Sequence, residues 1–290
     1  MDYHGDRRHG SGASPVSQDK QILLVGFGNM GQALARGWLA KGHAADAIHV
    51  VDPEPGAREV AAKLRLRTSA AIEERSADPD RRIDIVVLAV KPNQLAAVLE
   101  KCRAAESPNR VFLSIAAGKS IQQLLHVLGP KAAVVRAMPN TPAAIGQGMT
   151  VLTASGTVTS AQRTLCGDLM AAVGAIAWVD DEGQMDAVTA VSGSGPAYVF
   201  LLIECLEQAA VDMGLARELA KQLATMTVAG AGAYARSSHE TAAQLRQRVT
   251  SPGGTTQAAL AQLNSAGGLA ELIGRAVRAA TVRSRELSAV

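Results

Sequence analysis

Aromatic residues and cysteines are scarce in this 290-residue sequence, which has 3% aromatic residues and three cysteines. So few aromatic rings disfavour a surface that recognises RNA or sugars by stacking. Cys102, Cys166 and Cys205 lie far apart and form no CxxC pair. This spacing argues against a zinc site or a disulfide framework and is typical of a reducing compartment, so we expect a cytoplasmic protein without a bound metal.

Long apolar runs and clusters of one charge are also missing. No apolar stretch reaches about 18 residues without a charge or a turn former, so no membrane-spanning helix is expected. The net charge is only +3, from 29 basic and 26 acidic residues, and the basic residues are not clustered as nucleic-acid binding requires. Residues 1–20 are polar and lack the apolar core of a signal peptide, so we expect a flexible tail there.

The sequence is instead rich in small residues, and short apolar runs alternate with stretches of helical spacing. Strands are predicted at Ile22–Val25, Ile48–Val51, Ile83–Val90, Val111–Ile115, Ala133–Arg136, Met149–Thr153 and Ala175–Val179. Helices are predicted between them at Asn29–Lys41, Gly56–Leu64, Leu95–Arg103, Ile121–Leu128 and Ser160–Val173. Such alternation is typical of βαβ units and a parallel sheet that is buried on both faces.

The pattern changes after Asp181, where only Ala- and Leu-rich segments with helical spacing follow. Helices are predicted at Pro196–Met213, Ala216–Tyr234, Thr241–Val249, Thr255–Asn264 and Leu269–Ser284. The sequence therefore predicts an α/β protein in three parts. These are a tail at residues 1–20, a doubly wound, mostly parallel sheet domain at 21–181, and an all-helical domain at 182–290.

The loop after the first predicted strand has the spacing G-x-G-x-x-G and opens a helix. In this context the first glycine makes a tight turn, the second lets the backbone approach a pyrophosphate, and the third lets the helix pack closely on the strand. The helix N-terminus adds N–H groups and a positive dipole end. The motif predicts a Rossmann domain that binds NADH or NADPH through Gly26, Phe27, Gly28, Asn29, Met30 and Gly31.

Asp52 ends the second predicted strand, 21 residues after Gly31. An acidic residue at this place usually bonds the ribose 2′-hydroxyl and favours NAD. Asp52 also fits a turn or helix-capping role, and Arg58 could instead meet the 2′-phosphate of NADP. The choice between NADH and NADPH therefore stays open.

Ala89, Val90, Lys91 and Pro92 end the third predicted strand. Ligands bind at the carboxyl ends of parallel strands in this architecture, and a proline biases the residue before it toward extended backbone. Lys91 would then present backbone carbonyl groups to a cofactor, although a solvated surface lysine is the alternative interpretation.

Three further segments rich in small residues are 138–142 (MPNTP), 192–198 (SGSGPAY) and 251–256 (SPGGTT). The last two lead into predicted helix N-termini, which bind anions through their N–H groups. Each alone also fits an ordinary cap or turn. Together with the glycine loop, however, they indicate a binding site.

These motifs, in this order, resemble those of the Δ1-pyrroline-5-carboxylate reductase family. The resemblance runs from about Ile22 to Arg285, and its most specific part is LRQRVTSPGGTTQAALAQLN at residues 245–264. AVKP at 89–92, SIAAG at 114–118, RAMPNTP at 136–142 and SGSGPAY at 192–198 match other motifs of that family.

The resemblance implies reduction of 1-pyrroline-5-carboxylate to L-proline by NADPH or NADH, the final step of proline biosynthesis. It also implies an interlocked homodimer formed by the helical domain, which in the family often assembles into a pentamer of dimers. The hydroxyl of Thr256 would lie near the ring nitrogen, and the substrate carboxylate would bind Ser251, Gly253, Gly254 and Thr255. Gly26–Gly31, Ala89, Val90, Lys91, Pro92, Ile115, Ala116 and Ala117 would line the cofactor.

One departure concerns the adenosine, near which family members often carry an asparagine in the loop after the second βα unit. Here that region reads Thr68-Ser69-Ala70-Ala71, so this contact is missing or replaced. The chemistry is otherwise consistent, because a cyclic iminium accepts hydride readily and needs no strong protein acid. No carboxylate or histidine lies in the glycine loops.

Two other functions were considered. A related two-domain hydroxy-acid dehydrogenase uses a lysine and an asparagine on the first helix of its second domain, as alcohol oxidation needs a base. Residues 196–206 contain neither. A non-catalytic dinucleotide-sensing module would not need an intact SPGGTT loop.

Overall fold

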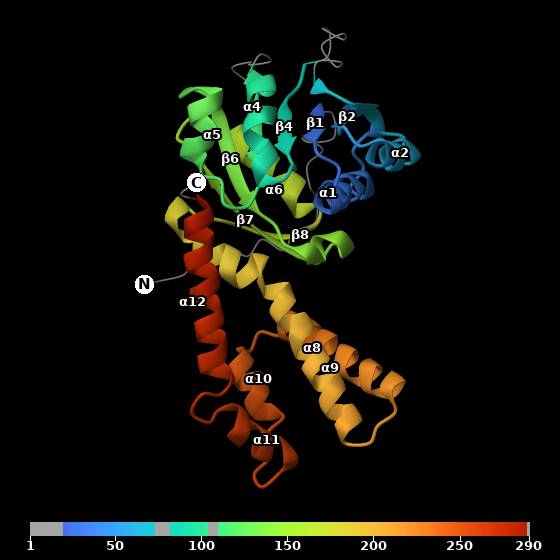
Figure 1. Cartoon of the computed structure of the whole chain (residues 1–290), viewed down its shortest axis with the longest axis vertical. Coiled ribbons are helices and arrows are strands. Elements are labelled where there is room, and N and C mark those ends of the chain that lie inside the picture. The colour runs from blue at the N-terminus through green and yellow to red at the C-terminus, as the bar shows by residue number, and fades with distance from the viewer. Residues whose placement is uncertain (1–19, 73–81, 104–109, 289–290) are drawn as a thin grey trace. The chain divides into compact units, whose positions relative to one another are not determined.

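The structure is a computed structural model that describes residues 20–72, 82–103 and 110–288 (Figure 1). Contacts between Cα atoms divide the chain into two compact units, Met1–Glu182 and Gly183–Val290. The expected N-terminal tail lies outside the described residues, apart from Lys20.

The first unit is built on a sheet of eight strands in the order β3-β2-β1-β4-β5-β6-β7-β8. The strands are β1 (Ile22–Val25), β2 (Ile48–Val51), β3 (Arg67–Ser69), β4 (Ile85–Leu88), β5 (Val111–Ser114), β6 (Ala133–Met138), β7 (Gly148–Ala154) and β8 (Gly174–Trp178). All neighbouring strands are parallel except β6 and β7, which are antiparallel. The order 3-2-1-4-5-6 is that of dinucleotide-binding sheets, so the predicted fold class is confirmed.

Helices cover both faces of this sheet. On one face lie α1 (Asn29–Ala40), α2 (Pro55–Lys63) and α6 (Ser160–Ala171), with Trp38 fully buried and its indole N–H donating to the Leu169 carbonyl at 2.9 Å. On the other face lie α4 (Leu95–Arg103) and α5 (Ile121–Leu128). Along β1 the side chains alternate between these two cores, which explains why its sequence is apolar at every position.

The edge strand β3 was not expected from the sequence, which predicted a loop at residues 68–71. Arg67, Thr68 and Ser69 pair in parallel with His49, Val50 and Val51 of β2. The three residues are half-buried and contain no apolar run. Pairing with β2, rather than local propensity, therefore makes this segment a strand.

The second unit is all-helical, as predicted. Its helices are α7 (Met185–Val188), α8 (Gly195–Asp212), α9 (Arg217–Ser237), α10 (Ala242–Arg248), α11 (Thr255–Leu263) and α12 (Leu269–Ser288). A π-helical segment, Thr189–Gly193, joins α7 to α8. The long helices α8 and α9 pack together, and the Ser284 hydroxyl of α12 donates to the Asp186 carboxylate of α7 at 2.7 Å.

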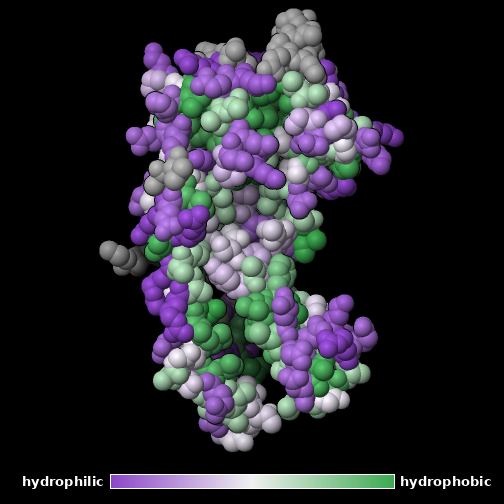
Figure 2. All heavy atoms as spheres, in the orientation of Figure 1, coloured by the Kyte–Doolittle hydropathy of each residue, from purple (hydrophilic) through white to green (hydrophobic). Residues whose placement is uncertain are grey.

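Apolar side chains lie on the surface of these helices (Figure 2). Among the described residues, every exposed large hydrophobic side chain except Ile145 belongs to the second unit. The helical segment Glu182–Asp212 is long and apolar enough to cross a membrane by length and composition, and 6% of its apolar window is buried. Exposed apolar surface of this extent is typical of an interaction surface.

Candidate functional site

The glycine loop between β1 and α1 has the geometry that its spacing predicts. Gly26 has a φ of +95°, and a Cβ at this residue would lie 2.6 Å from the Ala89 carbonyl oxygen. A Cβ at Gly31 would lie 2.5 Å from the Gly26 carbonyl oxygen, so α1 approaches the turn too closely for any side chain there. A Cβ at Gly28, by contrast, would meet no atom within 4 Å. Space is therefore open beside Gly28, where a pyrophosphate would approach the backbone.

The buried carboxylate of Asp52 holds this loop in place. Its Oδ2 accepts the Phe27 N–H at 2.7 Å, and its Oδ1 accepts the Glu54 N–H at 2.9 Å. Asp52 is 8% exposed. Asp52 therefore has the turn-forming role. It can also bind a ribose hydroxyl, because each carboxylate oxygen has a second lone pair.

A cavity of about 630 Å³ opens at the carboxyl ends of β1, β2 and β4. Its lining residues are Val25, Gly26, Gly28, Val51, Asp52, Pro53, Glu54, Ala70, Ala71, Ile72, Ala89, Val90, Lys91, Asn93, Gln94, Ala97, Val98 and Lys101. The volume lies within the usual range of cofactor sites, about 300–1,000 Å³. The cavity brings together six of the predicted cofactor residues: Gly26, Gly28, Asp52, Ala89, Val90 and Lys91.

Several predicted cofactor residues do not line this cavity. They are Phe27, Asn29, Met30, Gly31, Pro92, Ile115, Ala116 and Ala117. Phe27 is 1% exposed and belongs to the core under the loop. Residues 115–117 follow β5 at the same edge of the sheet, where the Ile115 N–H donates to the Leu88 carbonyl at 3.1 Å.

Sequence analysis missed one wall of the cavity, which is formed by Asn93, Gln94 and helix α4. Lys91 has φ −62° and ψ 147°, the extended conformation expected before Pro92. A short 3₁₀ helix, Pro92–Gln94, then leads into α4. Gln94, Ala97, Val98 and Lys101 have the spacing i, i+3, i+4, i+7, so this face could have been found from the sequence once α4 was placed beside the loop.

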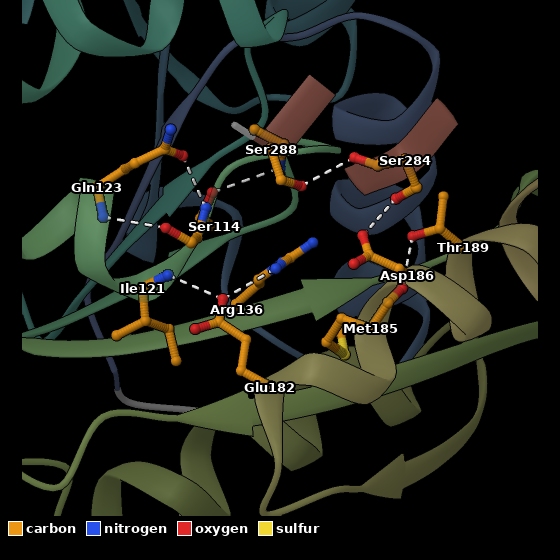
Figure 3. A network of polar contacts seen from close by, with 12 residues as sticks. Ser114, Ile121, Gln123, Arg136, Glu182, Met185, Asp186, Thr189, Ser284 and Ser288 are labelled. Atoms are coloured by element: carbon orange, nitrogen blue, oxygen red, sulfur yellow. Dashed lines mark hydrogen bonds and ion pairs between the residues drawn. The ribbon is translucent and has the colours of Figure 1, made fainter. Parts of the chain in front are cut away.

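Arg136 of β6 forms an ion pair with Glu182, in which the arginine side chain is buried and the glutamate side chain is half-buried (Figure 3). Arg136 Nη1 lies 2.8 Å from Glu182 Oε1, and the same oxygen accepts the Ile121 N–H at 2.9 Å. Arg136 Nη2 is buried and has no hydrogen-bond partner among the described residues. Nearby in the chain, Asn140 Oδ1 accepts the Met149 N–H at 2.9 Å and thereby fixes the MPNTP segment.

The segment 192–198 is not a loop, because it continues from the π-helical segment into α8, so the expected free helix N-terminus is not present there. The π-helical segment runs directly into α8, so the backbone N–H groups have partners inside the helix. The Ser194 N–H donates to the Thr189 carbonyl at 2.8 Å, and the Ala197 N–H donates to the Ser194 carbonyl at 3.0 Å. The Tyr198 hydroxyl donates to the Ala190 carbonyl at 3.1 Å.

The SPGGTT segment does form a turn that opens a helix, as predicted. Gly253 has a φ of +70°, and Gly254 is the N-cap of α11. A Cβ at Gly254 would lie 2.7 Å from Ser251 Oγ, so any other residue there would displace the Ser251 hydroxyl. Ser251 and Thr255 are exposed, and Thr256 is half-buried on the first turn of the helix.

Gln257 was not named by sequence analysis, yet it controls this turn. Its Oε1 accepts the Gly253 N–H at 2.6 Å, while the Gly254 N–H donates to the Ser251 carbonyl at 3.1 Å. Both glycine N–H groups that were expected to meet a carboxylate therefore have partners within the turn. The spacing of Gln257, three residues after the N-cap, is that of a capping glutamine and is a signal visible in the sequence.

The described residues contain no group of three or more His, Cys, Asp or Glu side chains that could hold a metal ion. The groups at the glycine-loop cavity and the SPGGTT turn are backbone N–H groups, hydroxyls, the side-chain amides of Asn93 and Gln94, the acidic residues Asp52 and Glu54, and the lysines of the cavity.

The doubly wound sheet, the glycine loop and the cavity beside it define a dinucleotide-dependent oxidoreductase with a helical second unit. A model described as "NADP oxidoreductase coenzyme F420-dependent" matches residues 21–118, and one described as "Pyrroline-5-carboxylate reductase dimerisation" matches residues 182–287. The chain belongs to the pyrroline-5-carboxylate reductase family.

Individual relatives support this membership over nearly the whole chain. The pyrroline-5-carboxylate reductase of Pseudomonas aeruginosa is 44% identical over 92% of this chain and 97% of that protein. The enzyme of Haemophilus influenzae is 39% identical over 93% of this chain and 98% of that protein.

Solved structures agree. The pyrroline-5-carboxylate reductase of Coxiella burnetii has a TM-score of 0.86 and 38% identity, covering 93% of this chain and 99% of that chain. The Plasmodium falciparum enzyme with NADP bound has a TM-score of 0.80 and 31% identity, covering 93% of this chain and 99% of that chain.

Proposed function

We propose that this protein reduces 1-pyrroline-5-carboxylate to L-proline with NADPH or NADH. The observation that carries the proposal is the cavity beside the open backbone at Gly28, in a chain of the pyrroline-5-carboxylate reductase family. We assign dinucleotide binding to residues 21–181, and substrate binding and dimerisation to residues 182–290.

NADH or NADPH, when bound, would supply the hydride that reduces the imine carbon. The chain's own part begins with Gly28 and the N-terminus of α1, which would present N–H groups and a positive dipole end to the pyrophosphate, while Gly26, whose N–H donates to the Val51 carbonyl at 2.8 Å, makes the turn. Asp52 keeps this loop in place through its bond to the Phe27 N–H. Ala89, Val90, Lys91 and Pro92, with Ile115, Ala116 and Ala117, border the cofactor at the ends of β4 and β5.

The SPGGTT turn binds the substrate carboxylate. The Ser251 hydroxyl and the N–H groups of Gly253 and Thr255 at the start of α11 provide neutral donors, and Gly254, whose own N–H donates to the Ser251 carbonyl, shapes the turn. Such donors bind a carboxylate without placing a cation near the substrate iminium. The Gly253 N–H becomes available when the Gln257 side chain moves off it.

Thr256 has the catalytic role at the ring nitrogen. Its side chain is half-buried on the first turn of α11, where the hydroxyl can donate to, or accept from, the imine nitrogen. Because the iminium can be protonated before it binds, orientation and exclusion of water carry the rate enhancement.

The enzyme works as a cytoplasmic homodimer, and further assembly gives a pentamer of dimers; it binds neither nucleic acid nor membranes. The exposed apolar side chains of α8 and α9, including Phe200, Leu201 and Met226, support burial against a second copy. Light scattering at micromolar concentration tests this assembly, and a monomer contradicts it.

The experiment for the activity is a spectrophotometric assay of the purified protein. We expect oxidation of NADH or NADPH only when the cyclic imine is supplied, and no reaction with 2-hydroxy acids and NAD or NADP. A folded protein that leaves both reduced dinucleotides unchanged in the presence of the imine refutes the proposal.

A further inference from the structure

We infer that Glu54, acting beside Asp52, makes the dinucleotide site select NADH over NADPH by repelling a 2′-phosphate. The inference rests on the proposed use of this cavity for a dinucleotide. It adds a residue and a direction of preference, neither of which follows from family membership.

The position of the adenosine ribose follows from the fold. In doubly wound sheets the ribose 2′-position meets the residue at the carboxyl end of the second strand, which here is Asp52 after β2. The cavity wall at this place is Asp52, Pro53 and Glu54. Two carboxylates therefore line the corner in which the 2′-substituent of the ribose would lie.

The two carboxylates differ in how they are held. Asp52 is fixed by the N–H groups of Phe27 and Glu54, with spare lone pairs for a ribose hydroxyl. Glu54 is exposed, and its side chain makes no capping bond to α2 although the residue is the N-cap. Glu54 thus contributes a charge at the cavity wall that the local fold does not require.

Arg58 is the cation that could neutralise a 2′-phosphate, but its guanidinium binds backbone carbonyl groups. Arg58 Nη1 donates to the Asp52 carbonyl at 2.8 Å and to the Pro53 carbonyl at 2.6 Å. Arg58 is not among the residues that line the cavity. Its guanidinium therefore stabilises the turn between β2 and α2 through backbone carbonyl groups and does not line the cavity.

Two lysines line the cavity at other places. Lys91 follows β4, which is separated from β2 by β1, so its backbone lies roughly 10 Å across the sheet from the end of β2. Lys101 is on the last turn of α4 and already takes part in another interaction. The corner therefore carries two acidic residues and one cation, and the Nη1 of that cation, Arg58, donates to backbone carbonyl groups. Glu54 then supplies a repulsive element that admits a hydroxyl and opposes a phosphate.

The test compares binding of NADH and NADPH by fluorescence titration, in the absence of the imine. The variant is Glu54→Gln, and the matched control is Glu59→Gln, which removes an exposed carboxylate from the same helix but outside the cavity lining. We expect the wild type to bind NADH about tenfold more tightly than NADPH. Glu54→Gln should tighten NADPH binding about fivefold and change NADH binding less than twofold. The increase in NADPH affinity should be smaller at high salt, which screens the charge of Glu54 in the wild type. Glu59→Gln should leave the ratio unchanged.

A wild type that prefers NADPH, or a Glu54→Gln protein with the wild-type ratio of affinities, overturns the inference and leaves the proposed reductase function intact. Failure of the folded wild-type protein to bind either dinucleotide overturns both, because the cavity would then not be a dinucleotide site. The ratio of kcat/KM with NADH to kcat/KM with NADPH, measured in the imine assay, is an independent measure of the cofactor preference.

Discussion

Arg136 and Glu182 form an ion pair in which the arginine side chain is 5% exposed and the Nη1–Oε1 distance is 2.8 Å. Glu182 Oε1 also accepts the Ile121 N–H, the first backbone donor of α5. One carboxylate oxygen thus neutralises a buried guanidinium and satisfies a helix terminus. Both partners are needed, because an unpaired charge at this depth is strongly destabilising.

Glu182→Ala should therefore lower the free energy of unfolding by about 3–5 kcal/mol. Urea denaturation at fixed protein concentration measures this loss. The control is Glu286→Ala, which breaks the exposed Arg283–Glu286 pair and should cost only about 0–1 kcal/mol. Equal losses in the two variants would show that the buried position of Arg136 is unimportant.

Substitution of two glycines in one loop should separate folding from binding. Gly26→Ala places a methyl group 2.6 Å from the Ala89 carbonyl oxygen and forces alanine into a φ of +95°, so the melting temperature should fall. Gly28→Ala meets no protein atom within 4 Å and should fold normally. Its methyl group should nevertheless weaken NADH and NADPH binding at least tenfold, or about 1.4 kcal/mol. Thermal melts and fluorescence titrations of both variants check this, and normal dinucleotide binding by Gly28→Ala would contradict the placement of the pyrophosphate.

Thr256→Ala should lower kcat about ten- to a hundredfold, the range for loss of a hydrogen bond to a charged group, with little change in dinucleotide affinity. Steady-state kinetics with the cyclic imine measure the effect. Thr256→Ser should recover most of the activity because it restores the hydroxyl. The control Thr281→Ala removes a hydroxyl that donates to the Val277 carbonyl on α12 and should leave kcat unchanged. A Thr256→Ala enzyme with the wild-type kcat would remove Thr256 from the mechanism.

His43 should make the protein less stable at mildly acidic pH. Burial lowers the pKa of His43, an effect that the nearby Asp168 carboxylate partly offsets, and Nδ1 is buried without a hydrogen-bond partner among the described residues. The unfolded chain then binds a proton at about pH 6.5 and the folded chain only at lower pH, so the free energy of unfolding falls as pH drops below about 6.5.

The measurement is urea denaturation at pH 7.5 and 5.5. His43→Leu should show a smaller decline across this range than the wild type, because it removes the group that must be protonated on unfolding. His239→Leu, at an exposed histidine, should decline as the wild type does. If His43→Leu and the wild type lose stability in parallel, His43 does not carry the pH dependence.

Features of the fold that depend on local pattern could be predicted from the sequence. The strand Ile22–Val25, the turn at Gly26 and the helix from Asn29 each follow from residue types next to one another in the chain. The strand Arg67–Ser69 could not be predicted, because its polar residues become a strand only by pairing with β2. The helical form of residues 189–193 was missed for a related reason, since serine and glycine, at Ser192 and Gly193, are typical of loops.

In the candidate site, too, residues that follow a local pattern could be predicted from the sequence, and residues placed by packing could not. Glycines were found because a backbone that must approach a ligand needs them at fixed spacing. Gln94 and Lys101 were missed because their place on the cavity wall depends on how α4 packs against the sheet. The Arg136–Glu182 pair joins residues 46 positions apart, so no local pattern reveals it.

The π-helical segment Thr189–Gly193 holds one more residue than the α-helical turn it replaces. Because a π-helix has more residues per turn, its five residues advance the chain around the helix axis by about as much as four α-helical residues do. A one-residue deletion within the segment would therefore restore regular α-helix and leave the side chains of α8 facing as they do now. The same deletion inside α8 would rotate every later side chain by about 100°. Loss of one residue is thus tolerable in the π-helical segment and disruptive in the helix that follows it.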